Sequence, residues 1–328
     1  MSVTLRRSLC GALLAGTLAL APLAAAAQTF PSKPIKIIVP LSPGGAGDAA
    51  SRLIGQKLSD RLGQPVVVEN QPGASGSIGM NALKRAAPDG HTIGLAISTA
   101  HTADLVQNKK STFDIVDDFT PITAIATNPS GLVVNSIIAA ASLADFVAFV
   151  RARPGEVSYG NSGLATAHHL YGQLLNKYAG ISMVNVPYRG VTPALNDLLA
   201  GHVPAAILSF TPALPFIQKG ELRVLTVFDA ARYSKLPDVP AISELIAGFP
   251  PARTWLGYFG PAGLPPAITA RLHREIVAII ATAEVRRFFS DNGLEVIVNT
   301  PSEFGVMLRA ETRMWDEAAA AAGLIAAP

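Results

Sequence analysis

Residues 35–48 read IKIIVPLSPGGAGD, and this stretch decides the fold class. The β-branched run 35–39 predicts a buried strand, which Pro40 halts because proline cannot donate a hydrogen bond to a neighbouring strand. The glycine-rich segment 43–48 then leads into residues 49–62, whose apolar positions recur at helical spacing. A strand, a glycine-rich loop and a helix in this order form the first part of a βαβ unit.

The same alternation continues along the chain. Further strands are predicted at residues 66–68, 92–97, 157–159, 184–186, 206–208, 224–227 and 255–259, and helices at 77–86, 143–153, 167–179, 193–200, 266–282 and from Pro301 onward. Short strands that alternate with helices predict an α/β fold with two lobes, each a mostly parallel sheet flanked by helices.

Two segments are expected to join the lobes. The turn-forming cluster 128–131 separates two apolar runs and marks a first crossing. The residues from Trp255 onward are predicted to pack back on the first lobe, which requires a second crossing. We therefore expect lobe 1 to comprise residues 28–128 and 255–328 and lobe 2 to comprise residues 129–254, with a two-strand hinge and a cleft between them.

Residues 1–27 are typical of an export signal. Arg6 and Arg7 form a short basic start, residues 9–23 form an apolar run, and residues 25–27 offer a small-residue cleavage site. The apolar run is shorter than the roughly 20 residues that span a bilayer. We expect cleavage near the end of this segment and a periplasmic mature protein, exported by the Sec route or, given the arginine pair, by the twin-arginine route.

Composition excludes several function classes. Without residues 1–27 the chain carries 24 basic and 23 acidic side chains, a net charge of +1, which offers no field for nucleic acid. The same cleavage removes Cys10, the only cysteine, and with it any disulfide, thiolate metal site or thiol catalysis. His168 and His169 are adjacent, so a helix points them about 100° apart, and they suit capping or packing better than metal binding. We expect no metal, no cofactor and a monomer.

The loop after the first strand can bind an anion. Its backbone N–H groups lie where a helix begins, so the candidate ligand-binding residues are Ser42, Gly44, Gly45, Ala46 and Asp48. A purely structural turn is the second interpretation of this loop.

A dinucleotide site is the third interpretation. Gly45, Gly47 and Ala50 fit the pattern G-x-G-x-x-A after a strand, and Glu69 ends the next strand. Asp48 would face the pyrophosphate in such a site, which disfavours it. An exported enzyme is therefore an alternative function, although the sequence offers no nucleophile paired with a base.

Lobe 2 carries a matching loop, since residues 160–166 read GNSGLAT between a strand and a helix that Thr166 can cap. Similar loops on both lobes suit a clamp around a small carboxylate. Arg189 can pair with a ligand carboxylate or with a local partner, and Tyr188 can wall the ligand body. The further candidates are Ser98 and Thr99 in lobe 1 and Asn161, Ser162, Gly163, Thr166, Tyr188, Arg189 and Ser209 in lobe 2.

Several motifs occur in one order over roughly residues 30–300. They are residues 33–40 with 43–45 and Asp48, 68–70 with 73–76, 88–92, Ser162-Gly163 with Thr166 and His169-Leu170, 186–190, 236–240 and 260–263. Together they resemble the tripartite tricarboxylate transporter substrate-binding proteins, the Bug receptors.

The resemblance implies a type II-like periplasmic binding protein that captures a dicarboxylate, tricarboxylate or aromatic carboxylate in its cleft. It implies delivery to a membrane permease with a large and a small subunit, and ligand contacts made largely by backbone N–H groups and bridging waters of the two loops. Leu164 and Ala165 depart from the usual small or polar pair, and residues 202–206 lack an acidic residue often found there. Both departures bear on the ligand's identity, and a sensing role remains an alternative to transport.

Overall fold

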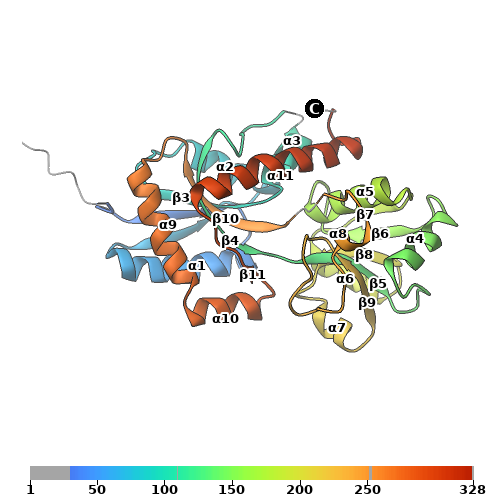
Figure 1. Ribbon diagram of the computed structural model, residues 1–328. Helices are drawn as coiled ribbons and strands as arrows, with labels where there is room; N and C mark the ends of the chain where they lie inside the picture. The colour runs from blue at the N-terminus through green and yellow to red at the C-terminus, as the bar shows by residue number, and fades with distance from the viewer. Residues whose placement is uncertain (1–29, 109, 251–252, 327–328) are drawn as a thin grey trace, which may run out of the picture.

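A computed structural model describes residues 30–108, 110–250 and 253–326 of the chain, and these fold into two lobes (Figure 1). The predicted export signal, its cleavage site near Ala27 and Cys10 lie outside the described residues. Across the described ranges, no helix is both long and apolar enough to cross a bilayer.

Lobe 1 is built on a six-stranded sheet in the order β11-β4-β10-β3-β1-β2. Helices cover both faces, and each face has its own cluster of buried apolar side chains. The strands are β1 Ile35–Val39, β2 Val66–Asn70, β3 Thr92–Ile97, β4 Phe119–Thr127, β10 Trp255–Pro261 and β11 Glu295–Val296. One face carries α1 Ala46–Leu62, α9 Pro266–Ile280 and α10 Ala283–Asp291, and the other carries α2 Ser77–Lys84, α3 Ala100–Asn108 and the first half of α11 Pro301–Ala321.

Lobe 2 is built on a five-stranded sheet in the order β7-β6-β8-β5-β9. The strands are β5 Ser130–Asn135, β6 Ser158–Asn161, β7 Val184–Pro187, β8 Ala205–Ser209 and β9 Leu222–Val227. One face packs against α4 Leu143–Arg151, α5 Ala167–Ala179, α8 Ile242–Leu245 and the end of α11, and the other against α6 Val191–Leu199 and α7 Leu214–Gln218.

The expectation of mostly parallel sheets is wrong for the strands next to the crossings. The pairs β1–β2, β1–β3, β6–β7 and β6–β8 are parallel, but β10 is antiparallel to β3 and β4, and β5 is antiparallel to β8 and β9. The reason is geometric. A chain that returns to a lobe enters the sheet at the edge where other strands leave it, so the returning strand must run the opposite way.

This arrangement brings the loops that the sequence singles out to the two edges that face each other. Because β4 is antiparallel to β10 and β10 to β3, the carboxyl ends of β1, β2 and β3 lie where β4 departs for lobe 2. Because β5 enters lobe 2 antiparallel to β8, the carboxyl ends of β6, β7 and β8 lie at the edge nearest lobe 1. Loops at the carboxyl ends of strands are the usual ligand sites of open α/β sheets.

The two crossings are bonded to each other. The N–H of Asn128 donates to the carbonyl of Thr254 at 2.8 Å, and the Thr254 hydroxyl donates to the carbonyl of Asn128 at 2.5 Å. Helix α11 gives a further link, since it begins on lobe 1 and reaches lobe 2 (Figure 1), where the Trp315 ring meets Tyr171 edge-on at 5.2 Å.

The predicted elements agree with the observed ones to within three residues at each end. The predicted Thr166 cap of α5 is confirmed. Ser142 and Thr300 form capping boxes at the starts of α4 and α11, and the N-cap of α2 is Gly76. The sequence analysis misses α3, α7, α8, α10 and β11, and it describes β4 and β5 only as two apolar runs. Most of these are too short or too polar to show a clear apolar period.

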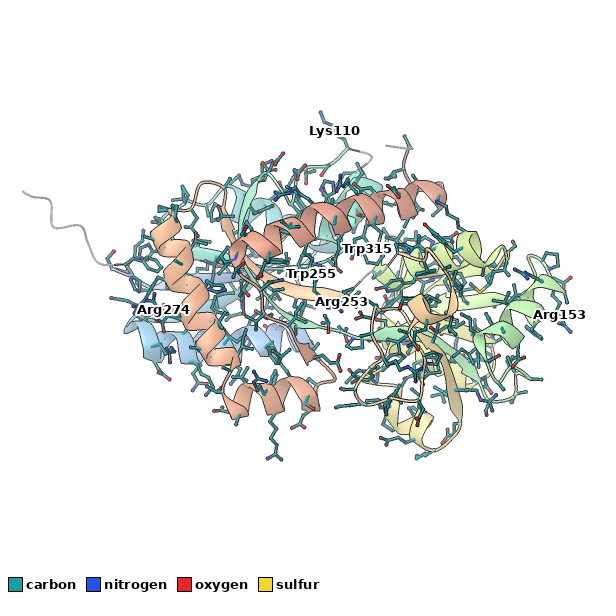
Figure 2. All side chains as sticks on the ribbon, viewed as in Figure 1. Lys110, Arg153, Arg253, Trp255, Arg274 and Trp315 are labelled. Carbon is teal, nitrogen blue, oxygen red and sulfur yellow. The ribbon has the colours of Figure 1, made fainter. Side chains whose placement is uncertain are left out.

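A buried acidic group lies beside the second crossing. Glu311 of α11 accepts a hydrogen bond from the indole N–H of Trp255, and the nearby Arg253 is ion-paired with Asp229 at 2.8 Å. Figure 2 labels Arg253 and Trp255 between the lobes and Trp315 on α11. Burial raises the pKa of Glu311 to about 7.

Glu311→Gln keeps an acceptor for Trp255 but removes the ionisation. Because the pKa of Glu311 is higher in the folded protein than in the unfolded chain, wild-type stability falls as the pH rises between about 4.5 and 7. We expect the variant to escape this fall and to be more stable than wild type by about 1–2 kcal/mol above pH 7. Urea unfolding across this range measures the difference.

The matched control is Glu317→Gln, because Glu317 is an exposed carboxylate on the same helix. Its unfolding free energy should follow the wild-type dependence on pH. Parallel curves for wild type and Glu311→Gln would contradict the expectation.

Candidate ligand-binding site

The first-lobe loop, residues 41–48, is organised around the carboxylate of Asp48, which is 3% exposed. This carboxylate accepts hydrogen bonds from the Gly44 N–H at 2.9 Å, from Arg52 Nε at 3.2 Å and from Asn70 Nδ2 at 2.9 Å. Asn70 also donates to the carbonyl of Leu41 at 3.1 Å, which ties the loop to the end of β2.

Asp48 is held as a carboxylate. Burial alone would raise its pKa, but the hydrogen bonds from Gly44, Arg52 and Asn70 outweigh burial and lower the pKa below the ordinary value. The sequence analysis treats Asp48 and the Gly44 N–H as candidates for ligand contact. The structure pairs them with each other, so both take part in holding the loop, and Asn70 is a supporting residue that the sequence analysis misses.

The start of α1 leaves backbone donors free. Gly45 is its N-cap, in an extended conformation, and no side chain caps the helix. The first-turn N–H groups, including that of the candidate Ala46, therefore have no acceptor within the helix and lie at its positive end. A Cβ at Gly47 would lie 2.8 Å from Leu41 Cδ1 and 3.2 Å from Leu95 Cδ2, so a larger residue here would require these side chains to move.

Close packing at Gly47 explains the dinucleotide-like pattern without a dinucleotide. Glu69, which would bind a ribose in that interpretation, is ion-paired with Lys36 on the neighbouring strand at 2.6 Å.

Hydroxyl groups follow β3 and β8 at the facing edges. Ser98, Thr99 and Ser209 are buried, and their hydroxyls have no hydrogen-bond partner among the described residues. The Ser98 N–H donates to the carbonyl of Trp255 at 3.2 Å, so this loop is attached to the second crossing. Ser42 is exposed in the first-lobe loop.

The second-lobe loop, residues 161–166, is supported by Asn161, which is fully buried at the end of β6. Its amide nitrogen donates to Asn185 Oδ1, and its amide oxygen accepts from the Gly163 N–H at 2.9 Å. Asn161 and the Gly163 N–H, both candidates for ligand contact, therefore pair with each other, as Asp48 and Gly44 do in lobe 1. The carbonyl of Ser162 accepts from the Gly190 N–H at 3.2 Å, which joins the loop to the one after β7.

Thr166 closes the loop onto α5. Its hydroxyl donates to the carbonyl of Gly163 at 2.8 Å and accepts from the His169 N–H at 3.4 Å. Ala165 has a φ of 58°, and its N–H donates to His169 Nδ1 at 3.2 Å. Only the third N–H of α5 is capped, so the first two remain without an acceptor in the helix.

A second histidine lies behind this loop. His168 is buried, with Nδ1 2.7 Å from Ser162 Oγ and Nε2 3.1 Å from Ser130 Oγ. Burial lowers the pKa of His168 to about 4, so the imidazole is neutral at neutral pH. The sequence analysis expects His168 to pack or cap and gives no signal for its contact with Ser130, because the two residues are 38 positions apart.

Tyr188 and Arg189 follow β7 and have different surroundings. The Tyr188 hydroxyl donates to Asp197 Oδ2 at 2.7 Å, and burial together with this bond raises the pKa of Tyr188 to about 12. The side chain of Arg189 is exposed and has no partner among the described residues.

Two other kinds of site, a metal site and a pocket within lobe 1, are less suited to binding a ligand. No group of three or more His, Cys, Asp or Glu side chains that could hold a metal ion occurs in the described part of the chain. A pocket of about 400 Å³ lies at the amino ends of β1 and β3, the edge of lobe 1 away from lobe 2. Lys33 and Lys36 line it, but each is already ion-paired, with Asp89 and Glu69.

Asp48→Asn preserves the size of the side chain but replaces one carboxylate oxygen with an NH₂ group, which faces the donors that bond to Asp48. We expect the free energy of unfolding without ligand to fall by about 1–3 kcal/mol at neutral pH, because buried donors lose a charged acceptor. Since the pKa of Asp48 is lowered in the folded state, the wild-type advantage is present above the ordinary aspartate pKa and is lost as the pH falls through the folded value. Urea unfolding of both proteins tests this.

Asp60→Asn is the control, because Asp60 is an exposed carboxylate on the same helix without a hydrogen-bond partner among the described residues. Its unfolding free energy should match that of wild type. Equal unfolding free energies for wild type and Asp48→Asn at neutral pH would show that Asp48 does not hold the loop.

Comparison with known proteins agrees with this architecture. A family model described as the tripartite tricarboxylate transporter family receptor matches residues 50–323. The chain is 37% identical over 292 residues to a UPF0065 protein from the tcbD-tcbE intergenic region of Pseudomonas sp. (strain P51), covering 88% of this chain and 86% of that protein. It is 34% identical to protein BugT of Bordetella pertussis (strain Tohama I), covering 88% of this chain and 89% of BugT.

Solved structures share the whole fold. A periplasmic transporter is similar with a TM-score of 0.75 at 32% identity, covering 90% of this chain and 99% of that one. R. palustris Rpa4515 with adipate has a TM-score of 0.73 at 30% identity, covering 90% and 98%. MatC (Rpa3494) from Rhodopseudomonas palustris with bound malate has a TM-score of 0.72 at 27% identity, covering 88% and 99%. With two α/β lobes, two crossings and loops at the facing edges, the chain belongs to the tripartite tricarboxylate transporter receptor family, whose members are periplasmic solute-binding receptors rather than enzymes.

Proposed function

We propose that this receptor captures a small dicarboxylate with a short aliphatic body between its lobes and delivers it to a tripartite tricarboxylate-type permease. The observation that carries the proposal is the pair of helix N-termini, those of α1 and α5, each with free first-turn N–H groups at one of the two facing edges. Each can bind one carboxylate group, because unpaired amides and the helix dipole both favour an anion.

Side chains at the same edges support the charge and the body of such a ligand. Arg189 is a cation without a partner among the described residues, and a guanidinium can pair with a carboxylate through two hydrogen bonds. Ile78, in the first turn of α2, and Leu164, in the second-lobe loop, lie at the facing edges and are 54% and 56% exposed. Apolar groups of this kind suit a methylene chain between two carboxylates, and two relatives were solved with malate and with adipate.

The roles of the predicted site residues follow from this proposal. Gly45, Ala46, Ser42, Ser98 and Thr99 supply donors from lobe 1. Ser162, Ser209 and Arg189 supply them from lobe 2, and Thr166, whose hydroxyl donates to the carbonyl of Gly163, holds the loop that carries Ser162. Asp48 with Gly44 and Asn161 with Gly163 hold the two loops in shape, and Tyr188 braces the loop that carries Arg189 through its bond to Asp197.

Ligand capture requires both lobes. A ligand that contacts both loops binds the closed arrangement more tightly than the open one and shifts the population toward it by that difference in affinity. We infer that the permease recognises this closed form. We also infer that residues 1–27 direct export and are removed.

Thermal unfolding with a panel of carboxylates that includes malate and adipate tests the proposal. A ligand at 100 times its dissociation constant stabilises the folded state by about 2.7 kcal/mol. We expect a clear upward shift of the unfolding midpoint with at least one dicarboxylate and none with a neutral sugar or with NAD. The absence of a shift with every carboxylate, for protein refolded from denaturant to remove bound ligand, would contradict it.

Arg189→Ala should weaken binding of the active dicarboxylate by about 10-fold to 100-fold, the effect of losing a charged hydrogen bond. Its ligand-free unfolding midpoint should stay unchanged, because Arg189 has no partner within the described protein. Arg85→Ala is the control, since Arg85 is also exposed and unpartnered but lies at the other end of α2, away from the facing edge. Isothermal titration compares them, and equal affinity of the two variants would remove Arg189 from the site.

A further inference from the structure

Side-chain hydrogen bonds run from the second-lobe loop to both crossings. Ser162 Oγ lies 2.7 Å from His168 Nδ1, and His168 Nε2 lies 3.1 Å from Ser130 Oγ. Ser130, the first residue of β5, also lies 3.1 Å from the carbonyl of Asn128. That carbonyl accepts from the Thr254 hydroxyl in the other crossing. The loop and the hinge are therefore joined through one imidazole.

The number of protons available decides which atom donates in each of these hydrogen bonds. Ser130 has a single hydroxyl proton, which it donates to the Asn128 carbonyl, so it must accept from His168 Nε2–H. A neutral imidazole carries one N–H, so Nδ1 is then an acceptor. The single Ser162 hydroxyl proton has two acceptors within reach, His168 Nδ1 at 2.7 Å and Thr166 Oγ1 at 3.2 Å, and in this pattern it is donated over the shorter distance, to Nδ1. The burial of His168, which lowers its pKa to about 4, keeps the ring neutral and preserves this pattern at neutral pH.

We propose that His168 is a positioning residue that couples occupation of the second-lobe loop to the hinge by exchanging one hydrogen-bond pattern for another. The proposal rests on the proposed function, in which a carboxylate lies against this loop. An anion there accepts the Ser162 proton, which leaves His168 Nδ1 without a donor. In the alternative hydrogen-bond pattern, the ring proton is on Nδ1, which donates to Ser162. The Ser130 hydroxyl then turns and donates to Nε2.

This second pattern releases the Asn128 carbonyl from Ser130 and changes the bonding of the first crossing. No proton is gained or lost, since the ring proton moves from Nε2 to Nδ1 and the two hydroxyls reorient. With an anion at Ser162, the first pattern leaves His168 Nδ1 unpaired, whereas the second pairs every member of the buried network, so anion binding favours the second pattern. The loop and the hinge therefore change together.

The test without ligand is amide hydrogen exchange at Asn128, whose N–H bonds to Thr254 across the crossings. Ser162→Ala removes the donor to Nδ1, and His168→Gln keeps a group near the Nε2 position but loses contact with Ser162. We expect each variant to speed exchange at Asn128 by about threefold to tenfold, the effect of weakening one hydrogen bond.

Ser51→Ala is the matched control, because Ser51 is a fully buried serine whose hydroxyl accepts from Tyr258 in lobe 1, outside the chain of bonds from Ser162 to Thr254. It should leave exchange at Asn128 unchanged. Wild-type exchange at Asn128 in Ser162→Ala would overturn the proposal, whatever ligand the protein binds.

Imidazole ¹⁵N chemical shifts give a second, independent readout. We expect His168 to be the Nε2–H tautomer in the ligand-free protein and to become the Nδ1–H tautomer with saturating malate or adipate, whichever stabilises the protein. An Nδ1–H ring without ligand, or no change on binding, would overturn the proposal. If neither compound nor any other carboxylate stabilises the wild type, the proposed function fails, and the ligand-free tautomer and exchange still decide the role of His168.

Discussion

Asn128 and Thr254 bond to each other where the chain passes between the lobes, and the direction of these two passages constrains the rest of the molecule. Since β4 leaves lobe 1 and β10 returns to it at the same edge, these strands are antiparallel neighbours. The parallel strands β1, β2 and β3 then end at the edge that faces lobe 2. In lobe 2, β5 imposes the same order on β6, β7 and β8. The facing loops are thus a consequence of the crossings.

A surface that binds through backbone N–H groups needs support for the loops that carry them. In lobe 1 this support is the carboxylate of Asp48, and in lobe 2 it is the amide of Asn161. Each is buried and pairs with a glycine N–H of its own loop. The first-turn N–H groups of α1 and the first two N–H groups of α5 have no acceptor within their helices. Buried polar groups hold a backbone in one conformation because leaving them unpaired is costly. Several residues that carry the family resemblance therefore support the loops of the candidate site from the protein interior.

Two buried polar groups lie beside the crossings between the lobes. Helix α11 spans the lobes and brings Glu311 against Trp255, where burial keeps the carboxyl partly protonated at neutral pH. His168 links the second-lobe loop to Ser130 at the other crossing. Both groups are buried and polar, and both lie beside the segments that join the lobes. A receptor that works by closing can place its adjustable groups at such positions, because the interiors of the lobes are packed clusters of apolar side chains.

The sequence by itself determined most of the strands and helices and the order of the loops, because apolar period, glycine, proline and capping residues act over a few neighbouring positions. It was sufficient for the Thr166 cap of α5. Strand direction beside the crossings, the inward pairing of Asp48 and Asn161, and the contact between His168 and Ser130 were decided only by tertiary structure. These depend on residues far apart in the chain, and no local pattern records which of them the fold brings together.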